Sequence, residues 1–217
     1  MRAVVLALGG GASNTLNRAI RTGALDVPSI AANTDAQDLK RSLAPTRLQV
    51  GTKLTKGLGA GGDAEVGRDA AKVDFDELVA ALAGAEVVVI LACLGGGTGS
   101  GGAGVVCRAV EAAGAIPYLV VTLPLPFEGR RRARTATDAL AELGRVTGGL
   151  LAVAETPMPP PEDRVTMAEM FARCDASVIS AAQAALALVR GESAPEGSPE
   201  RPLASLREAL ADRHPSG

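Results

Sequence analysis

The sequence predicts an α/β protein with a doubly wound, mainly parallel sheet that carries helices on both faces. Short apolar runs rich in β-branched residues alternate with longer segments of helical periodicity, which is typical of β-α-β units. Glycine clusters follow two of these runs directly, as in the strand-to-helix turns of nucleotide-binding folds. The chain has 217 residues, 47% of them hydrophobic, so it is long enough to bury one substantial core.

The apolar runs have the length and continuous hydrophobicity of buried parallel strands, and the helical segments between them suit crossovers. Strands are expected at residues 3–8, 27–32, 86–92, 116–122 and 150–154. Helices are expected at residues 13–21, 65–83, 99–113, 130–144 and 165–189. The folded domain is therefore predicted to cover residues 1–190.

The segment after this domain has a different composition. Residues 191–202 are rich in Pro, Gly, Ser and Glu, which does not favour packing. Beyond them, Leu203, Leu206 and Leu210 fall on one face of a short helix. This helix either stays solvated or packed on its own chain, or docks in a partner's groove. Residues 191–217 are thus predicted to form a disordered tail with one short helix.

Composition excludes several partners. Three Phe, one Tyr and no Trp cannot build the stacking surface of a single-strand binder. The 22 Lys and Arg against 24 Asp and Glu give a net charge of −2, so no overall positive field attracts nucleic acid or anionic membranes. The N-terminal apolar run is too short to span a bilayer. We therefore expect no nucleic-acid partner and no integral membrane segment.

The scarce residues exclude common catalytic and metal sites. The only histidine is His214, in a polar tail, so a Ser-His-Asp or Cys-His apparatus is excluded and no catalytic residue is assigned. Cys93, Cys107 and Cys174 are odd in number and widely spaced, which disfavours a structural zinc or a disulfide framework. No metal-ligating residue is assigned, and a reducing cytoplasm is the expected location.

Three glycine clusters carry the chemistry. Residues 9–11 follow the first strand, residues 57–62 precede the helix expected at 65–83, and residues 95–102 follow the strand expected at 86–92. Backbone without side chains lets amide groups approach an anion, and a helix N-terminus adds a favourable partial charge. The clusters together predict one polyphosphate site.

The kind of phosphate ligand stays open at this point. Glycines that only make tight turns are the alternative to any phosphate site. A P-loop NTPase is disfavoured because no GxxxxGK[ST] occurs. Gly97, Gly99 and Gly102 satisfy GxGxxG, and Asp35 lies where a ribose-binding acid is expected, so a Rossmann dinucleotide enzyme competes.

The run GGGTGSG at residues 95–101 resembles the signature loop of the tubulin/FtsZ family. Four further segments are similar to bacterial FtsZ: LGGGASNTLNRAI from Leu8, AANTDAQDL from Ala31, GLGAGGDAEVGRDAA from Gly57 and PFEGRRRAR from Pro126. The resemblance covers residues 3–190. It implies the Rossmann-like nucleotide-binding domain of that family, GTP or GDP as ligand, and Mg²⁺ with GTP.

The resemblance also implies roles for single residues. Thr98 would add a hydroxyl hydrogen bond to the phosphates. Glu128 and Arg132 match the ribose-contacting pair, with a surface ion pair as the alternative. Asp175 matches the guanine reader and Phe171 the ring beside the base. The remaining implied nucleotide-binding residues are Gly9, Gly10, Gly11 and Asn14 near the α- and β-phosphates, Asn33 and Asp35 after the second strand, Ala60 and Gly61 near the γ-phosphate, Gly95, Gly96, Gly97 and Gly99 around the phosphates, Pro124, and Glu155 near the base.

Two departures from the family pattern change the expected function. Glu155-Thr156 stands where the family has Asn-Asp, and with Asp175 it places excess negative charge near the base, which weakens the expected guanine specificity. After the helix at 165–189, FtsZ continues into an acidic loop that completes hydrolysis on the next subunit and then into a second domain. Here Arg190-Gly191-Glu192-Ser193 follows instead.

These features predict a GTP- or GDP-binding protein with slow hydrolysis at most. It would act as a regulatory or assembly element of a prokaryotic cytoskeletal or division system. Self-association and a cytoskeletal or division protein both remain open as partners. A basic helix face could serve another mode of association, with a solvated helix face as the alternative for all but Arg132; it consists of Arg130, Arg131, Arg132 and Arg134. The alternative is a nucleotide-independent interaction module on the same scaffold.

Overall fold

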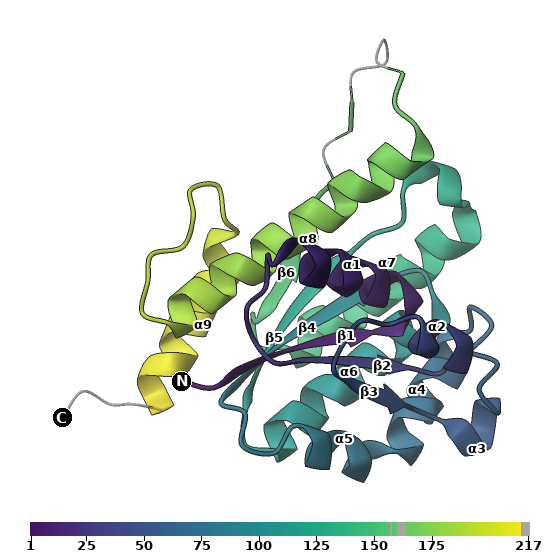
Figure 1. Cartoon of the computed structure of the whole chain (residues 1–217), viewed down its shortest axis with the longest axis horizontal. Helices are drawn as coiled ribbons and strands as arrows, with labels where there is room; N and C mark the ends of the chain where they lie inside the picture. Colours follow the sequence, from purple (N-terminus) through teal and green to yellow (C-terminus); the bar gives the residue numbers. More distant parts are fainter. Residues whose placement is uncertain (157, 160–163, 214–217) are drawn as a thin grey trace.

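The computed structural model describes residues 1–156, 158–159 and 164–213. Within them, six parallel strands form one sheet in the order β3-β2-β1-β4-β5-β6, which confirms the predicted fold class (Figure 1). The strands are β1 (Ala3–Leu8), β2 (Ser29–Asn33), β3 (Thr46–Gln49), β4 (Val87–Cys93), β5 (Ile116–Thr122) and β6 (Leu151–Val153).

Helices cover both faces of this sheet because alternate strand residues are apolar on both sides. On β1, Val5 packs in a cluster with Leu16 and Val178, whereas Leu6 packs in a second cluster with Val106 and Leu143. The first layer contains α1 (Gly9–Thr22), α8 (Met167–Val189) and α9 (Glu200–Arg213); the second contains α4 (Ala64–Val73), α5 (Phe75–Ala81), α6 (Gly97–Ala112) and α7 (Arg130–Val146). Three short helices complete the fold: α2 (Ala36–Lys40), α3 (Thr52–Thr55) and the 3₁₀ turn Pro126–Glu128.

The strand order reverses between β1 and β4, the two central strands. From β1 the chain crosses to β2 on one side, and from β4 it crosses to β5 on the other. Ligands of open α/β sheets bind in the crevice that such a reversal leaves at the carboxyl ends of the strands. Helices α1 and α6 both begin there, at Gly9 and Gly97.

The structure differs from the predicted elements at several places, and the short helices α2 and α3 were not predicted. Strand β3 was not predicted, because it is a short edge strand, exposed or half-buried, without a continuous apolar run. Helix α1 begins at Gly9, so the first glycine cluster is itself helical. The single helix expected at 65–83 is divided at Asp74, whose carboxylate accepts a 2.5 Å hydrogen bond from the Gly51 amide.

In the tail, the expected short helix is present as α9, and it packs on its own chain, which is one of the arrangements expected for it. Helix α9 is 14 residues long, and its Leu203, Leu206 and Leu210 are buried in the core layer that contains α8. Arg213 additionally donates to the Gly114 carbonyl. Isolated helices of this length are marginal in water, so the packing of the apolar face stabilises α9. The division of the chain at residue 190 stays a prediction.

Helix α8 is the only helix in the described part of the chain that is long and apolar enough, by these criteria alone, to cross a membrane. More than half (56%) of its apolar window is buried inside the fold. The core helix of a globular protein passes the same test. Its hydrophobicity is therefore accounted for by the sheet and by α9.

Candidate functional site

A cavity of about 500 Å³ opens at the carboxyl ends of β1, β4 and β5, within the size range of small-molecule sites. The starts of α1 and α6 form its floor, and α8 forms a wall. Most of the residues predicted to bind nucleotide line it. These are Gly9, Gly10, Gly11, Asn14, Gly96, Gly97, Thr98, Gly99, Pro124, Glu128, Arg132, Phe171 and Asp175. Their contact with a nucleotide stays a prediction.

Two helix N-termini face this cavity. The first residues of α1, Gly9–Gly11, and the first residues of α6, Gly97–Gly99, both line it. Neither helix has a side-chain hydrogen bond at its N-cap, so the first amides of both helices have no side-chain acceptor there. Unpaired amides and the positive ends of two helix dipoles favour an anion between them.

Close packing of the loops explains why the signature segment needs glycine. A Cβ atom at Gly97 would lie 2.6 Å from the Asp63 carbonyl oxygen and 2.7 Å from the Ala60 Cβ. The glycine-rich loop before α4 therefore lies directly against the start of α6. Ala60 and Gly61, predicted to sense a γ-phosphate, are in this loop but do not line the cavity.

Thr98 is buried, and its hydroxyl oxygen lies 2.7 Å from that of Thr34. Thr34 follows β2, so this hydrogen bond joins the β2–α2 corner to the signature loop. Sequence analysis assigned Thr98 a phosphate contact and did not identify its partner. Nothing in the local sequence pattern relates two residues that are 64 positions apart.

The β2–α2 corner shows a structural role for Asp35. Its carboxylate caps α2 by accepting from the amides of Gln37 at 2.8 Å and Asp38 at 3.1 Å. Neither Asp35 nor Asn33 lines the cavity. The amide nitrogen Nδ2 of Asn33 is buried without a partner among the described residues, and lies 4.0 Å from where a Cβ of Gly10 would be. This donor is directed toward the first glycine cluster.

The predicted ribose pair forms an ion pair. Arg132 Nη1 lies 2.6 Å from Glu128 Oε2, and Glu128 Oε1 accepts from the Leu125 amide at 2.8 Å. Both residues line the cavity together with Pro124. The pair is thus held in place on the β5–α7 connection. This geometry is compatible with a ribose contact and with the ion pair kept as the alternative, so the role of the pair stays a prediction.

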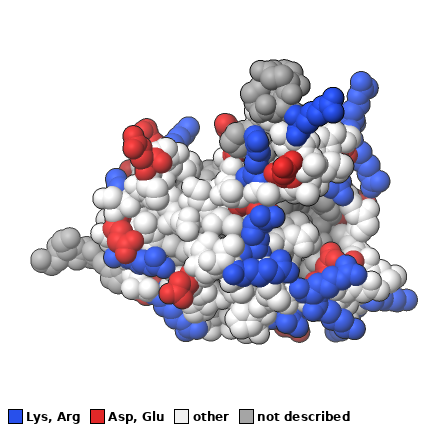
Figure 2. All heavy atoms as spheres, turned by 45° about the horizontal axis from the view of Figure 1, so that its top comes forward, with Lys and Arg blue, Asp and Glu red and all other residues white. Residues whose placement is uncertain are grey.

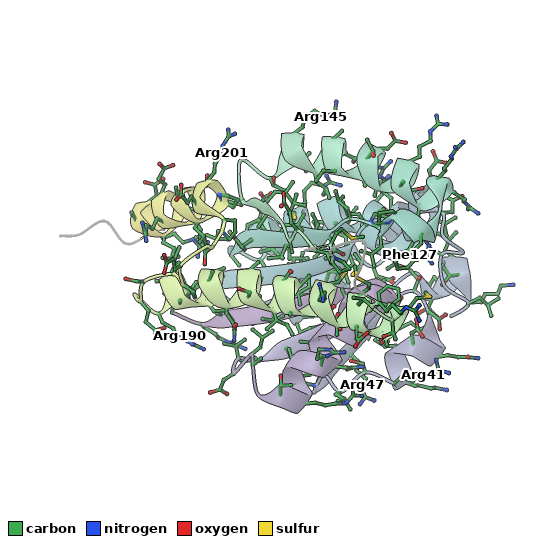
Figure 3. The ribbon with its side chains drawn as sticks, turned by 90° about the horizontal axis from the view of Figure 1, so that it is seen from above. Arg41, Arg47, Phe127, Arg145, Arg190 and Arg201 are labelled. Carbon is green, nitrogen blue, oxygen red and sulfur yellow. The ribbon has the colours of Figure 1, made fainter. Side chains whose placement is uncertain are left out.

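The predicted base end contains Asp175 and Phe171 on α8. Asp175 accepts from the Thr15 hydroxyl at 2.6 Å and pairs with Arg18 Nε at 2.9 Å. The Phe171 ring makes an edge-to-face contact with Phe127, with centroids 6.4 Å apart. Figure 3 shows Phe127 toward the same end of the molecule as Arg41, opposite Arg190 and Arg201.

Glu155 does not join Asp175 in the cavity. It lines a separate depression between β6 and the loop before α9, together with Ser177 and Ser198. The neighbouring Thr156 makes a 2.9 Å hydrogen bond with the Cys174 thiol, and Cys174 does line the cavity. The excess negative charge expected from Glu155 beside the base is therefore absent from the residues that line this cavity. Gly95 is also outside the lining.

Sequence analysis missed eight lining residues. Most are strand ends whose position follows from the sheet register, which a single sequence does not give. Asp38 is the one carboxylate among them, and it could have been found only by placing α2 beside the phosphate loop. The missed residues are Leu8, Thr15, Asp38, Cys93, Leu94, Thr122, Leu123 and Cys174.

Burial changes the chemistry of two thiols. Desolvation raises the pKa of Cys93, at the cavity floor, to about 11. The same cause raises the pKa of Cys107, within α6, to about 12. Both therefore stay protonated near neutral pH. Among the described residues, no group of three or more His, Cys, Asp or Glu could hold a metal ion.

The charged side chains that line the cavity are three carboxylates, Asp38, Glu128 and Asp175, and one cation, Arg132. Figure 2 shows Lys and Arg side chains outnumbering Asp and Glu on the right of the face drawn, the side on which the strands end. Because the chain's net charge is −2, this is a local feature and not a property of the whole surface.

Comparison with known proteins gives consistent matches. The sequence profile of the Tubulin/FtsZ family, GTPase domain, matches residues 2–154. Cell division protein FtsZ 1 of Pyrococcus abyssi is 41% identical over 152 residues, which are 70% of this chain and 41% of that protein. Cell division protein FtsZ of Azotobacter vinelandii is 41% identical over 149 residues, covering 69% of this chain and 38% of that protein.

Solved structures agree with the sequence matches. The FtsZ dimer, empty, from M. jannaschii superposes with a TM-score of 0.76 at 35% identity, covering 87% of this chain and 55% of that one. CetZ2 from Haloferax volcanii, described as a GTPγS-bound protofilament, gives a TM-score of 0.73 at 25% identity, with coverage of 91% and 61%. The chain spans 38–41% of the length of the two FtsZ sequences and 55–61% of the two solved structures. It belongs to the tubulin/FtsZ family, and its match lies in the GTPase domain.

Proposed function

We propose that this chain binds GTP or GDP in the cavity at the carboxyl ends of β1, β4 and β5. The observation that carries the proposal is the convergence of two uncapped helix N-termini, α1 and α6, on one cavity that also holds the Glu128–Arg132 pair and Asp175. Phosphates fit the glycine floor, the ribose fits the ion pair, and the base fits the end beside Phe171.

In this arrangement guanine is favoured over adenine at Asp175. A carboxylate accepts from two adjacent donors, and guanine presents them as N1–H and the 2-amino group. Adenine presents an acceptor at N1. Glu155 is outside the lining of the cavity, which supports guanine recognition by Asp175 without a second carboxylate beside the base.

The residues at the cavity could hold Mg²⁺ only together with the phosphates of a bound nucleotide. Mg²⁺ keeps several waters and is bound through substrate phosphates with one or two carboxylates. Asp38 is the carboxylate on the phosphate side, because its Oδ2 lies 2.6 Å from where a Cβ of Gly10 would be. When bound, the ion would neutralise phosphate charge there.

We further propose that the isolated chain hydrolyses GTP slowly or not at all. Each carboxylate that lines the cavity has a cationic partner: Glu128 with Arg132, Asp175 with Arg18, and Asp38 with Arg41 at 3.7 Å. Glu128 and Asp175 are held by short contacts to their partners, whereas the Asp38–Arg41 pair is longer and exposed. We infer that none of the three is a well-placed general base for a water, and losing such a base typically removes about 10²–10⁴ in rate. The segment 190–199 after α8 has two glutamates and no aspartate.

The cellular role that fits is a regulatory or assembly element of a cytoplasmic cytoskeletal or division system. Its support is the family and the names of its relatives, which include cell division proteins and a protofilament. Self-association is part of this proposal, and sedimentation velocity with and without GTP tests it. The alternative of a nucleotide-independent module that docks through its tail helix loses support, because the α9 leucines are buried within the chain.

Titration with a fluorescent GTP analogue tests the binding proposal. We expect saturable binding that GTP and GDP displace and that ATP and NAD do not. Absence of binding at high micromolar nucleotide, or equal displacement by ATP, would overturn it. Steady-state phosphate release tests the proposal of slow hydrolysis. Turnover as fast as that of a full-length FtsZ, and abolished by Thr98→Arg, would overturn this proposal.

A further inference from the structure

Three side chains join α1 to α8 at the base end of the cavity. Thr15 and Asp175 line the cavity, and Arg18 reaches Asp175 from outside the lining. The Thr15 hydroxyl donates to Asp175 Oδ1 at 2.6 Å, and Arg18 Nε lies 2.9 Å from Oδ2. The Asp175 side chain is 16% exposed and that of Arg18 is 47% exposed.

This arrangement fixes the carboxylate in direction and in plane. Thr15 and Arg18 are three residues apart, so they project from the same face of one helix. One donor reaches each oxygen, and a carboxylate held at both oxygens cannot rotate without breaking one of the two bonds. The Thr15 hydroxyl also lies 3.4 Å from the Gly11 carbonyl, but it has one proton and the Asp175 contact is much shorter.

The carboxylate nevertheless keeps capacity for a ligand. An ionised carboxylate has about four acceptor positions, and Thr15 and Arg18 occupy one on each oxygen. One position on each oxygen is left for two parallel donors. A purine with an N1–H beside a 2-amino group presents two such donors, and a bidentate contact of this kind depends strongly on the plane of the acceptor.

We propose that Thr15 and Arg18 are positioning residues that fix Asp175 for the recognition of the guanine 2-amino group. The inference rests on the proposed function and deepens it, since it names what sets base selectivity at that site. Neither residue needs to touch the nucleotide. Without either, Asp175 retains its charge and loses its fixed plane, so the second hydrogen bond to the base weakens.

A purely structural role for these contacts predicts something different. If the Thr15–Asp175–Arg18 bonds only hold α1 against α8, their loss lowers stability and weakens every nucleotide by the same factor. If they position Asp175, their loss changes the ratio of affinities between nucleotides that differ only in the 2-amino group. GDP and IDP are such a pair, because inosine keeps N1–H and lacks the amino group.

The experiment measures the dissociation constants of GDP, IDP and ADP for the full chain by competition against a fluorescent GDP analogue. The variants are Thr15→Val, which is isosteric, Arg18→Met, which keeps the stem, and Arg18→Lys, which keeps the charge. Arg21→Met on the same helix is the matched control, because Arg21 is exposed and has no ion pair among the described residues.

We expect the unaltered chain to prefer GDP over IDP by about tenfold or more, as for one charge-assisted hydrogen bond. Thr15→Val and Arg18→Met should each reduce this GDP:IDP ratio by about three- to tenfold with little change in IDP affinity. Arg18→Lys should restore part of the ratio, and Arg21→Met should leave it unchanged.

Two results would overturn the inference while leaving the proposed function intact. One is a GDP:IDP ratio that stays the same in folded Thr15→Val and Arg18→Met chains. The other is an equal loss of GDP and IDP affinity, which is the structural outcome. If Arg18→Met fails to fold, Thr15→Val and Arg18→Lys give the same comparison. An unaltered chain that binds no guanine nucleotide overturns the proposed function and the inference with it.

Discussion

The hydroxyl oxygens of Thr34 and Thr98 lie 2.7 Å apart in the interior, at the meeting of the β2–α2 corner and the signature loop. Thr34 is fully buried, and its hydroxyl has no other partner among the described residues, whereas Thr98 lines the cavity. The hydroxyl proton of Thr34 can therefore form a hydrogen bond only to the Thr98 hydroxyl oxygen. The Thr98 proton is then free to point to an anion in the cavity.

Replacing Thr34 with Val should therefore weaken nucleotide binding, although Thr34 does not line the cavity. Without the donor from Thr34, the Thr98 hydroxyl is no longer oriented, and one hydrogen bond is worth about 0.5–1.5 kcal/mol, or roughly three- to tenfold in affinity. Calorimetric titration with GDP measures this. Thr137→Val is the control, because that hydroxyl is exposed on α7 and bonds only the Ala133 carbonyl. An unchanged GDP affinity in a folded Thr34→Val chain would contradict the orientation of the Thr98 hydroxyl by Thr34.

Asp38 should oppose the phosphates when no divalent cation is present. Its side chain lies beside Gly10, and its Arg41 partner is 3.7 Å away and mostly exposed. Asp38→Asn should tighten GDP binding in EDTA by about three- to tenfold at low salt, since it removes one nearby like charge. With Mg²⁺ the difference should shrink. The matched change Asp69→Asn, at an exposed Lys72 partner on α4, should have no effect. Weaker binding by Asp38→Asn under both conditions would show that the carboxylate contacts the ligand favourably.

Two glycine-to-alanine changes should alter stability in opposite directions. A Cβ at Gly101 would overlap the Ala64 carbonyl oxygen and lie 2.6 Å from the Arg68 backbone nitrogen. Gly101→Ala should therefore push α4 away from α6 and lower the free energy of unfolding by about 1–3 kcal/mol. Gly144 is helical in α7 with open space around it, so Gly144→Ala should stabilise by about 0.5–1 kcal/mol. Urea unfolding measures both. Equal effects would mean that α4 and α6 are not in close contact.

Cys174 should be the first thiol to react with iodoacetamide at pH 8. It is half-buried in the cavity, whereas burial raises the pKa of Cys93 to about 11 and that of Cys107 to about 12, leaving both protonated at this pH. Only the thiolate is an effective nucleophile. Mass spectrometry of the labelled peptides identifies the site, and Cys174→Ser should remove the fast phase. Bound GDP should slow it severalfold. Faster labelling of Cys93 than of Cys174 would contradict the burial of the Cys93 thiol at the cavity floor.

The fold was predictable where physical signals are local. The all-apolar runs that became β1 and β4 and the glycines at their ends fix the central strands and the crevice between them. Edge strand β3 was not predictable, because half of a short edge strand is exposed and needs no apolar pattern. Helix α9 was predicted, but its packing partner stayed open. Its leucines Leu203, Leu206 and Leu210 are buried against the rest of the chain, which the sequence of a single segment does not reveal.

Most of the cavity lining was predictable from sequence motifs, whereas the hydrogen bonds between its residues and their partners were not. Glycines 9–11 and 96–99, Glu128, Arg132 and Asp175 were assigned because each lies in a recognisable segment. The partners Thr34, Thr15 and Arg18 were missed, because hydrogen bonds between residues 64 or 160 positions apart depend on the three-dimensional arrangement. Glu155 was placed near the base from a strand-end alignment, and the structure puts it in a different depression.

We propose that this chain holds a guanine nucleotide in the cavity between α1 and α6. Isothermal titration of the purified chain with GDP, repeated with ADP, tests it most directly. We expect saturable one-to-one binding of GDP, loss of that binding in a folded Thr98→Arg chain, and no comparable heat with ADP. Indistinguishable titrations for GDP and ADP, or no GDP binding at high micromolar concentration, would contradict it.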